Sequence, residues 1–125
     1  LILVKNLKHL ELLRELLPEA LTLEGKDDLL TREATIEKFK RDKHSILIGT
    51  KILQTGIDIP EITHMINARG LKSEIATLQA LGRALRIHES KTQVNIYDFN
   101  DTVPYLKEHS NARRRAYKSL KIKVL

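Results

Sequence analysis

Two arginines and a glutamine occur at a spacing that could grip a triphosphate. The leucine pattern between Ser73 and Arg86 predicts a helix. Gln79, Arg83 and Arg86 follow the i, i+4, i+7 rule and therefore share one face of it. Guanidinium groups on a rigid element bind phosphate oxygens in a fixed, bidentate geometry. The alternative interpretation is a solvated basic face on an amphipathic helix.

A second candidate site begins at Gly49 and Thr50, where a predicted strand ends. Backbone N–H groups at the start of the next helical turn can receive a phosphate, and the Thr50 hydroxyl can add a hydrogen bond. Further along, Gly56 permits a positive φ or the close approach of a ligand. Asp58 could accept a hydrogen bond from a ribose hydroxyl. An ordinary strand–turn–strand connection is the alternative interpretation.

The positive charge of the chain is concentrated near its C-terminal end. The net charge is +6, and residues 107–125 contain seven Lys and Arg but only one Glu, so the residues before them are neutral in sum. Arg113, Arg114 and Arg115 lie at the centre of this basic segment. Either the segment binds a polyanion or it is a solvated terminal helix.

Composition narrows the class of protein. The 125 residues suffice for one domain with an aliphatic core. Cysteine is absent, which excludes disulfides and thiolate metal sites, and the five histidines show no metal-ligand spacing. No apolar run approaches the ~18 residues of a membrane span, so we expect no membrane partner. The chain opens on an apolar strand pattern without an initiator Met, and we expect a fragment of a longer protein.

Predicted strands and helices alternate throughout. Strands are expected at residues 1–4, 20–23, 45–48, 63–67 and 94–99. One helix should carry Leu7 to Leu17, and another should end near Arg41 with Leu29, Ile36 and Phe39 inward. A last helix could be capped by Asp101 or Thr102 with Pro104 in its first turn. The aromatic residues Tyr97, Phe99, Tyr105 and Tyr117 are expected to pack in the core or between helices.

This alternation predicts an α/β fold, with a doubly wound, mostly parallel sheet and helices on both faces. In such sheets, ligands bind beyond the C-terminal ends of the strands. We therefore expect the loops after the first, third and fourth strands to meet at one edge, together with the face of the helix that carries Arg83 and Arg86.

Together these stretches resemble the superfamily 2 helicases. Gly49-Thr50 followed by Gly56-Ile57-Asp58-Ile59-Pro60 looks like motif V, and Gln79, Gly82, Arg83 and Arg86 are spaced as in motif VI. Leu1 to Asn6 matches motif IV, and Glu24-Gly25, Arg32-Glu33 and Phe39 match the segment that follows it. The resemblance covers about residues 1–100 in the family's order. Gln79 and Leu85 stand where DEAD-box proteins carry His and Gly, so the chain is more similar to the phage UvsW and XPB-like branch.

The resemblance implies a RecA-like fold and a role for each matching residue. Gly49, Thr50 and Lys51 would contact nucleic-acid phosphates. Gly56, Asp58 and Gln79 would bind ATP, with Asp58 near the ribose, and Arg83 or Arg86 would be the arginine finger. Arg32 is expected to be structural or to make a distant backbone contact.

The chain contains neither a Gly-x-x-x-x-Gly-Lys-Ser/Thr loop nor an acidic Mg²⁺ motif, and in the family both belong to the first motor domain. We therefore expect residues 1–125 to be a single second RecA-like domain, with residues 101–125 as a basic C-terminal helix or tail. By itself it should be inactive.

In the full-length protein the expected activity is that of an ATP-dependent DNA helicase or translocase. ATP and Mg²⁺ would be held mainly by the N-terminal RecA-like domain, which is the expected partner together with nucleic acid, DNA rather than RNA. The expected location is the cytoplasm of a bacterial or phage-infected cell. The alternative is a non-catalytic nucleic-acid-binding or scaffold module with the same fold.

Overall fold

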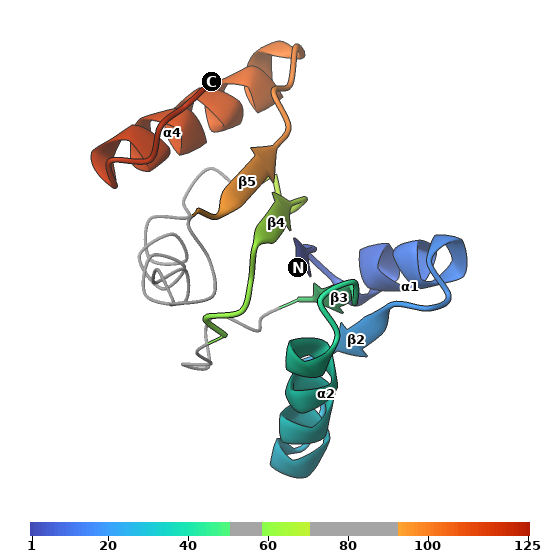
Figure 1. Ribbon diagram of the computed structural model, residues 1–125. Coiled ribbons are helices and arrows are strands. Elements are labelled where there is room, and N and C mark those ends of the chain that lie inside the picture. Colours follow the sequence, from blue (N-terminus) through green and yellow to red (C-terminus); the bar gives the residue numbers. More distant parts are fainter. Residues whose placement is uncertain (51–58, 71–92) are drawn as a thin grey trace.

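A parallel sheet organises the computed structural model, which describes residues 1–50, 59–70 and 93–125 (Figure 1). Within these residues the sheet has five strands, in the order β2-β3-β1-β4-β5, and every neighbouring pair is parallel. The strands are β1 (Ile2–Leu3), β2 (Leu21–Leu23), β3 (Leu47–Gly49), β4 (His64–Asn67) and β5 (Asn95–Asp98). The predicted mostly parallel, doubly wound sheet is confirmed.

The strands end in register at one edge of the sheet. Leu3 at the end of β1 pairs with Gly49 on one side and with Asn67 on the other. Asn67 in turn pairs with Asp98, the last residue of β5. Because all strands run in the same direction, the segments that follow them leave the sheet at this common edge.

Helices cover both faces of the sheet, and the alternation of side chains along β3 assigns each helix to a face. Ile48 belongs to the apolar cluster that contains Leu10 of α1 (Leu7–Leu16). Its neighbour Leu47 points the other way, into the cluster that α2 (Leu29–Arg41) and α4 (Pro104–Ser119) complete. Thus α1 packs on one face, and α2 and α4 pack on the other.

Each helix start reflects local sequence. Asn6 caps α1 by accepting a hydrogen bond from the N–H of His9 at 2.9 Å. Asp28 caps α2 by accepting one from the N–H of Thr31 at 2.7 Å. The start of α4 differs from the prediction, because the cap position is Val103, which has no side-chain hydrogen bond. Pro104 does begin α4, as expected.

Some predicted core residues lie at the surface. Ile36 and Phe39 of α2 are buried as predicted, but Leu29 is 70% exposed because it occupies the first position of α2, beyond the layer that packs on the sheet. Of the aromatic residues, Tyr117 is buried, whereas Tyr97, Phe99 and Tyr105 are exposed. The packing prediction was therefore right for Tyr117 and wrong for these three side chains.

Candidate functional site at the carboxyl edge of the sheet

The common edge gathers polar side chains from every strand. Glu24 follows β2, Thr50 follows β3, Asn6 lies beyond β1, Asn67 ends β4 and Asp98 ends β5. This is the edge at which open α/β sheets bind ligands. The described starts of the candidate loops therefore lie at one edge of the sheet, as predicted.

The loop after β2 is closed by its own side chains. The N–H of Glu24 donates to Asp27 Oδ2 at 2.7 Å, and the Glu24 carboxylate is paired with Arg14 at 3.4 Å and with Lys26 at 3.2 Å. Arg32 donates from Nε to the Asp27 carbonyl at 3.0 Å and from Nη2 to the Gly25 carbonyl at 2.9 Å. Arg32 therefore has the structural role expected from the sequence.

Asp28 completes this loop as the cap of α2. The hydrogen bonds that its carboxylate accepts from Thr31 lower the pKa of Asp28 from its ordinary value of 3.8. The ionised form is favoured because a backbone N–H at the positive end of the helix is directed at it.

Gly49 and Thr50 lie at the centre of the edge. The Gly49 carbonyl accepts a hydrogen bond from the N–H of Val4 at 3.0 Å, and the Thr50 N–H is 3.4 Å from the carbonyl oxygen of Leu23. The Thr50 side chain is only 6% exposed. Both residues are therefore tied to the strands on either side of β3. Lys51, Gly56 and Asp58, which complete the motif V-like stretch, lie outside the described residues.

The three consecutive arginines of α4 have different environments. Arg113 is buried, and its Nε lies 2.9 Å from one oxygen of Asp98 and 3.2 Å from the other. Its Nη2 donates to the Phe99 carbonyl at 2.9 Å. The structure differs here from the prediction of a phosphate contact, because this guanidinium is enclosed between α4 and the sheet.

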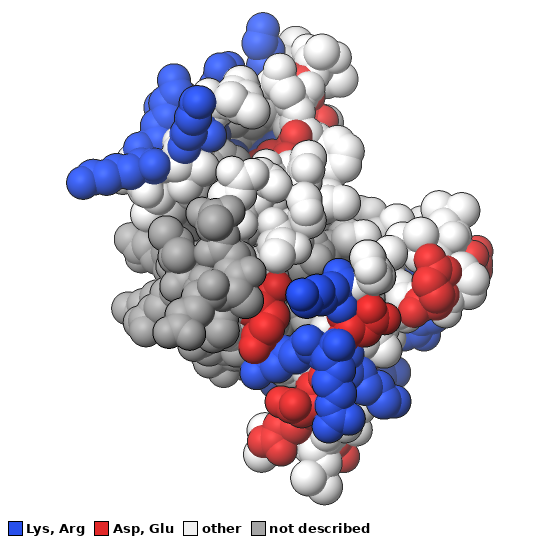
Figure 2. Space-filling model, in the orientation of Figure 1, with Lys and Arg blue, Asp and Glu red and all other residues white. Residues whose placement is uncertain are grey.

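Arg114 and Arg115 are exposed, as the predicted phosphate contact requires. Figure 2 shows Lys and Arg side chains gathered over the end of the molecule that α4 occupies, whereas basic and acidic atoms are interspersed around α1 and α2. The basic segment of the sequence thus forms a basic surface.

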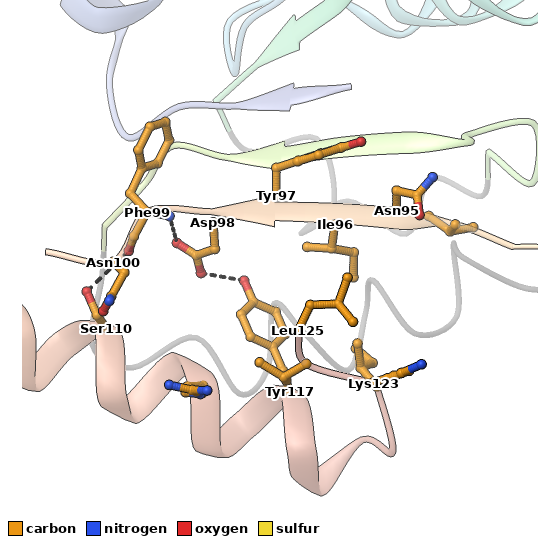
Figure 3. A pocket seen from close by; sticks show the side chains of 14 residues that line it. Asn95, Ile96, Tyr97, Asp98, Phe99, Asn100, Ser110, Tyr117, Lys123 and Leu125 are labelled. Carbon is orange, nitrogen blue, oxygen red and sulfur yellow. Dashed lines mark hydrogen bonds between the residues drawn. The ribbon is translucent and has the colours of Figure 1, made fainter.

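Sequence reasoning missed a buried polar cluster beneath α4. The Tyr117 hydroxyl donates to Asp98 Oδ2 at 2.6 Å (Figure 3). Asn67 Nδ2 donates to the Tyr117 oxygen at 3.1 Å. The signal that could have revealed it is an Asn directly after the apolar residues Met65 and Ile66 of a strand, since a buried amide requires partners. We call Asn67, Asp98, Arg113 and Tyr117 the α4 polar cluster.

A hollow of about 520 Å³ lies beside β5, bordered by α4 and the last residues of the chain (Figure 3). Ile96, Asp98 and Tyr117 contribute to its wall, and Arg114 and Lys123 supply cations. The Asp98 carboxylate is already bound by Arg113 and Tyr117. This favours a role for Asp98 in packing α4 on the sheet over a role in binding a ligand in the hollow.

Within residues 1–50, 59–70 and 93–125, no group of three or more His, Asp or Glu side chains is placed to hold a metal ion. In the same part of the chain, no helix has the length and apolar character needed to cross a membrane. The residues expected to face ATP, namely Gln79, Arg83 and Arg86, lie outside the described residues. Their ATP-facing roles remain predictions.

Known helicases are similar to this chain over most of its length. The family model of the helicase conserved C-terminal domain matches residues 1–88. The ATP-dependent DNA helicase uvsW of Enterobacteria phage T4 is 30% identical over 92 residues, which are 73% of this chain and 18% of that protein. The putative mitochondrial ATP-dependent helicase irc3 of Schizosaccharomyces pombe is 34% identical over 104 residues, 83% of this chain and 17% of that protein. The chain thus spans less than a fifth of the length of these relatives.

Solved structures share the fold. The C-terminal domain of the DEAD-box protein Dbp5 superposes with a TM-score of 0.71 at 24% identity, over 98% of this chain and 70% of that chain. The C-terminal part of the Fun30 ATPase domain superposes with a TM-score of 0.66 at 22% identity, over 99% of this chain and 40% of that chain. At these identities the likeness establishes the fold, and it confirms the expected RecA-like architecture.

Proposed function

The chain belongs to the helicase conserved C-terminal domain family, and on that premise we propose that it is the second motor domain of an ATP-dependent DNA helicase or translocase. In this proposal the domain supplies one wall of an ATP site and part of a nucleic-acid track. Residues 1–125 form this one domain, with residues 101–125 as its basic C-terminal part.

One observation carries the proposal. β3 and β4 lie on the two sides of β1, so the chain leaves the sheet next to the same strand at the start of the motif V-like stretch and again after β4, on its way to the motif VI-like residues. With neighbouring strands about 4.8 Å apart, these two exits are separated by roughly 10 Å. Residues that are distant in sequence could therefore contact a nucleotide and a nucleic-acid backbone at the same edge of the sheet.

ATP would be held mainly by the first motor domain, and the residues of this domain that contact it lie outside the described residues, with Gln79, Gly56 and Asp58 near the nucleotide and Arg83 or Arg86 against its γ-phosphate. The loop at Gly25 is not a phosphate cradle, because its carbonyl is bound by Arg32 and its backbone is closed by Asp27. Bound Mg²⁺ would neutralise phosphate charge, and its ligands would come from the first motor domain.

Nucleic acid would contact the motif V-like stretch around Gly49, Thr50 and Lys51 and the basic surface of α4. Arg114 and Arg115 are the arginines of that surface that could reach phosphates, since both are exposed. A resemblance to the phage DNA helicase supports DNA over RNA as the partner.

The test is steady-state ATP hydrolysis by the full-length protein beside a DNA titration at one salt concentration. We expect Arg83→Lys and Arg86→Lys each to lower ATP turnover about 10³-fold or more, because Lys lacks the planar fork that stabilises transition-state charge. DNA affinity should stay within a few-fold. Arg41→Lys, on an exposed position of α2, is the matched control and should leave turnover unchanged.

Near-normal turnover in both variants would contradict the ATP-facing assignment. Full-length protein that binds DNA without DNA-stimulated ATP hydrolysis would instead support the non-catalytic module.

A further inference from the structure

One face of the sheet becomes more exposed from β3 across to β5. Ile2 of β1 pairs with Ile48 of β3 and with Ile66 of β4. Ile66 pairs in turn with Tyr97 of β5, so these four side chains share the face on which α1 packs. Ile48 is fully buried, Ile2 and Ile66 are partly exposed, and Tyr97 is 52% exposed. Helix α1 therefore covers this face at β3 but not at β5.

Exposed aromatic side chains mark the part of the face that α1 leaves uncovered. Tyr97 stacks on His64 of β4, with ring centroids 6.1 Å apart and an angle of 24° between the ring planes. Phe99, directly after β5, is 60% exposed. Figure 3 shows Tyr97 and Phe99 on the side of β5 opposite to α4. We call His64, Ile66, Tyr97 and Phe99 the β5 aromatic face. A contiguous apolar surface of this kind marks an interaction site.

The dimensions of the β5 aromatic face match those of one helix. Because neighbouring strands lie about 4.8 Å apart, β4 and β5 together present a strip about 10 Å wide. An α-helix with its side chains is about 10–12 Å across. The four residues of β5 extend about 13 Å, which is the length of two helical turns or slightly more. A helix with one apolar side would therefore cover this face as α1 covers β3.

The contacts of Leu1 indicate which segment of the full-length protein reaches this face. The backbone nitrogen of Leu1 donates to the carbonyl oxygen of His64 at 2.9 Å, and Leu1 is buried. A residue bonded to that nitrogen therefore lies beside His64, at one end of the β5 aromatic face. The matched region is 18% of the phage helicase and 70% of the solved Dbp5 domain, so both of these proteins contain residues beyond it.

We propose that the segment of the full-length protein that joins the first motor domain to Leu1 forms a helix and packs its apolar side on the β5 aromatic face. This inference rests on the proposed function, in which a first motor domain precedes Leu1. The packing would fasten the connection between the two motor domains to the sheet of the second one.

The first measurement is hydroxyl-radical footprinting of the wild-type full-length protein, read by mass spectrometry. Tyr105 is the matched internal control, because it is also a tyrosine and is 70% exposed on α4. A helix on the β5 aromatic face should slow the oxidation of Tyr97 and Phe99 several-fold, so that Tyr97 reacts much more slowly than Tyr105. Similar oxidation rates for the two tyrosines would overturn the inference, and no variant has to fold for this result.

The second measurement identifies the occupant. The photoreactive amino acid p-benzoylphenylalanine replaces Tyr97 in the full-length protein, and in a control it replaces Tyr105. The ring at position 97 should cross-link to residues that precede Leu1 in the same molecule, whereas the ring at position 105 should not. A cross-link to a second copy, detected by mixing isotopically labelled and unlabelled protein, would overturn the inference. A cross-link to any other part of the chain, or none at position 97, would overturn it too.

These measurements separate the inference from the proposed function, because neither oxidation nor cross-linking requires ATP hydrolysis. Rapid oxidation of Tyr97 beside a strong loss of turnover in the arginine variants would reject only the packing of the preceding segment. Near-normal turnover in those variants beside a protected, cross-linked position 97 would reject the ATP-facing assignment and support the packing.

Discussion

Replacement of Arg113 by Met should destabilise the domain far more than the same replacement at Arg114. Met has a comparable length and fills most of the volume, so packing is largely kept. What is lost is a buried guanidinium with a 2.9 Å ion pair to Asp98 and a 2.9 Å hydrogen bond to the Phe99 carbonyl. The Phe99 carbonyl keeps a hydrogen bond from Ser110 Oγ at 3.2 Å, but Asp98 loses its countercharge.

The magnitude can be worked from these contacts. Removal of one partner of a buried ion pair typically costs about 3–5 kcal/mol, because the other charge stays buried without compensation. The Asp98 side chain is 16% exposed and keeps the Tyr117 hydroxyl at 2.6 Å, so we expect the lower end, about 3 kcal/mol. Arg114→Met, at an exposed position, should change the free energy of unfolding by less than about 0.5 kcal/mol.

The assay is urea unfolding of the 125-residue chain, followed by circular dichroism. With an m-value of roughly 1.5 kcal/mol/M, Arg113→Met should lower the midpoint by about 2 M. Addition of Asp98→Asn to Arg113→Met should recover part of this loss, because it removes the unpaired charge. If Arg113→Met and Arg114→Met unfold at the same urea concentration, the guanidinium does not support the contact of α4 with the sheet, and the reasoning is refuted.

Two further predictions concern the basic surface and the cap of α2. If Arg114 and Arg115 contact phosphates, the double variant Arg114→Ala, Arg115→Ala should reduce the steepness of log K against log salt for DNA binding by about 2. The control Arg41→Ala should leave this slope unchanged. If the double variant has the same slope as the wild type, this surface is only a solvated helix. Because the folded-state pKa of Asp28 lies below its unfolded value of 3.8, its carboxylate stabilises the fold above that value, and this stability is lost as the pH falls through the folded pKa. Asp28→Ala should therefore lower the urea midpoint at neutral pH but not in strong acid. Asp28→Asn keeps an acceptor oxygen for the cap but has no charge, so its midpoint at neutral pH should lie between those of the wild type and Asp28→Ala. A deficit in Asp28→Ala that persists at the lowest pH would show that the charge is not responsible.

Local sequence was enough to predict the strands, the order of the described elements and the family. Short apolar runs such as Leu1–Val4 and the period of Leu10, Leu13 and Leu17 are properties of neighbouring residues, and the structure confirms the elements they predict. The motif residues are recognisable for the same reason, since their spacing is visible along the chain. Only the sheet revealed that β3 and β4, the strands that precede these motifs in the sequence, lie on either side of β1.

Tertiary structure decided which cations face water. Arg113, Arg114 and Arg115 are identical in type and consecutive, but successive helix positions differ by about 100° in direction, so one of them is turned toward the sheet. Its partner Asp98 is 15 residues away, and Asn67 is 50 residues from Tyr117. Pairings over such separations depend on how α4 lies across the ends of β4 and β5, and no local pattern encodes that arrangement, because the free energy of each buried polar group depends on a partner that folding alone brings into contact.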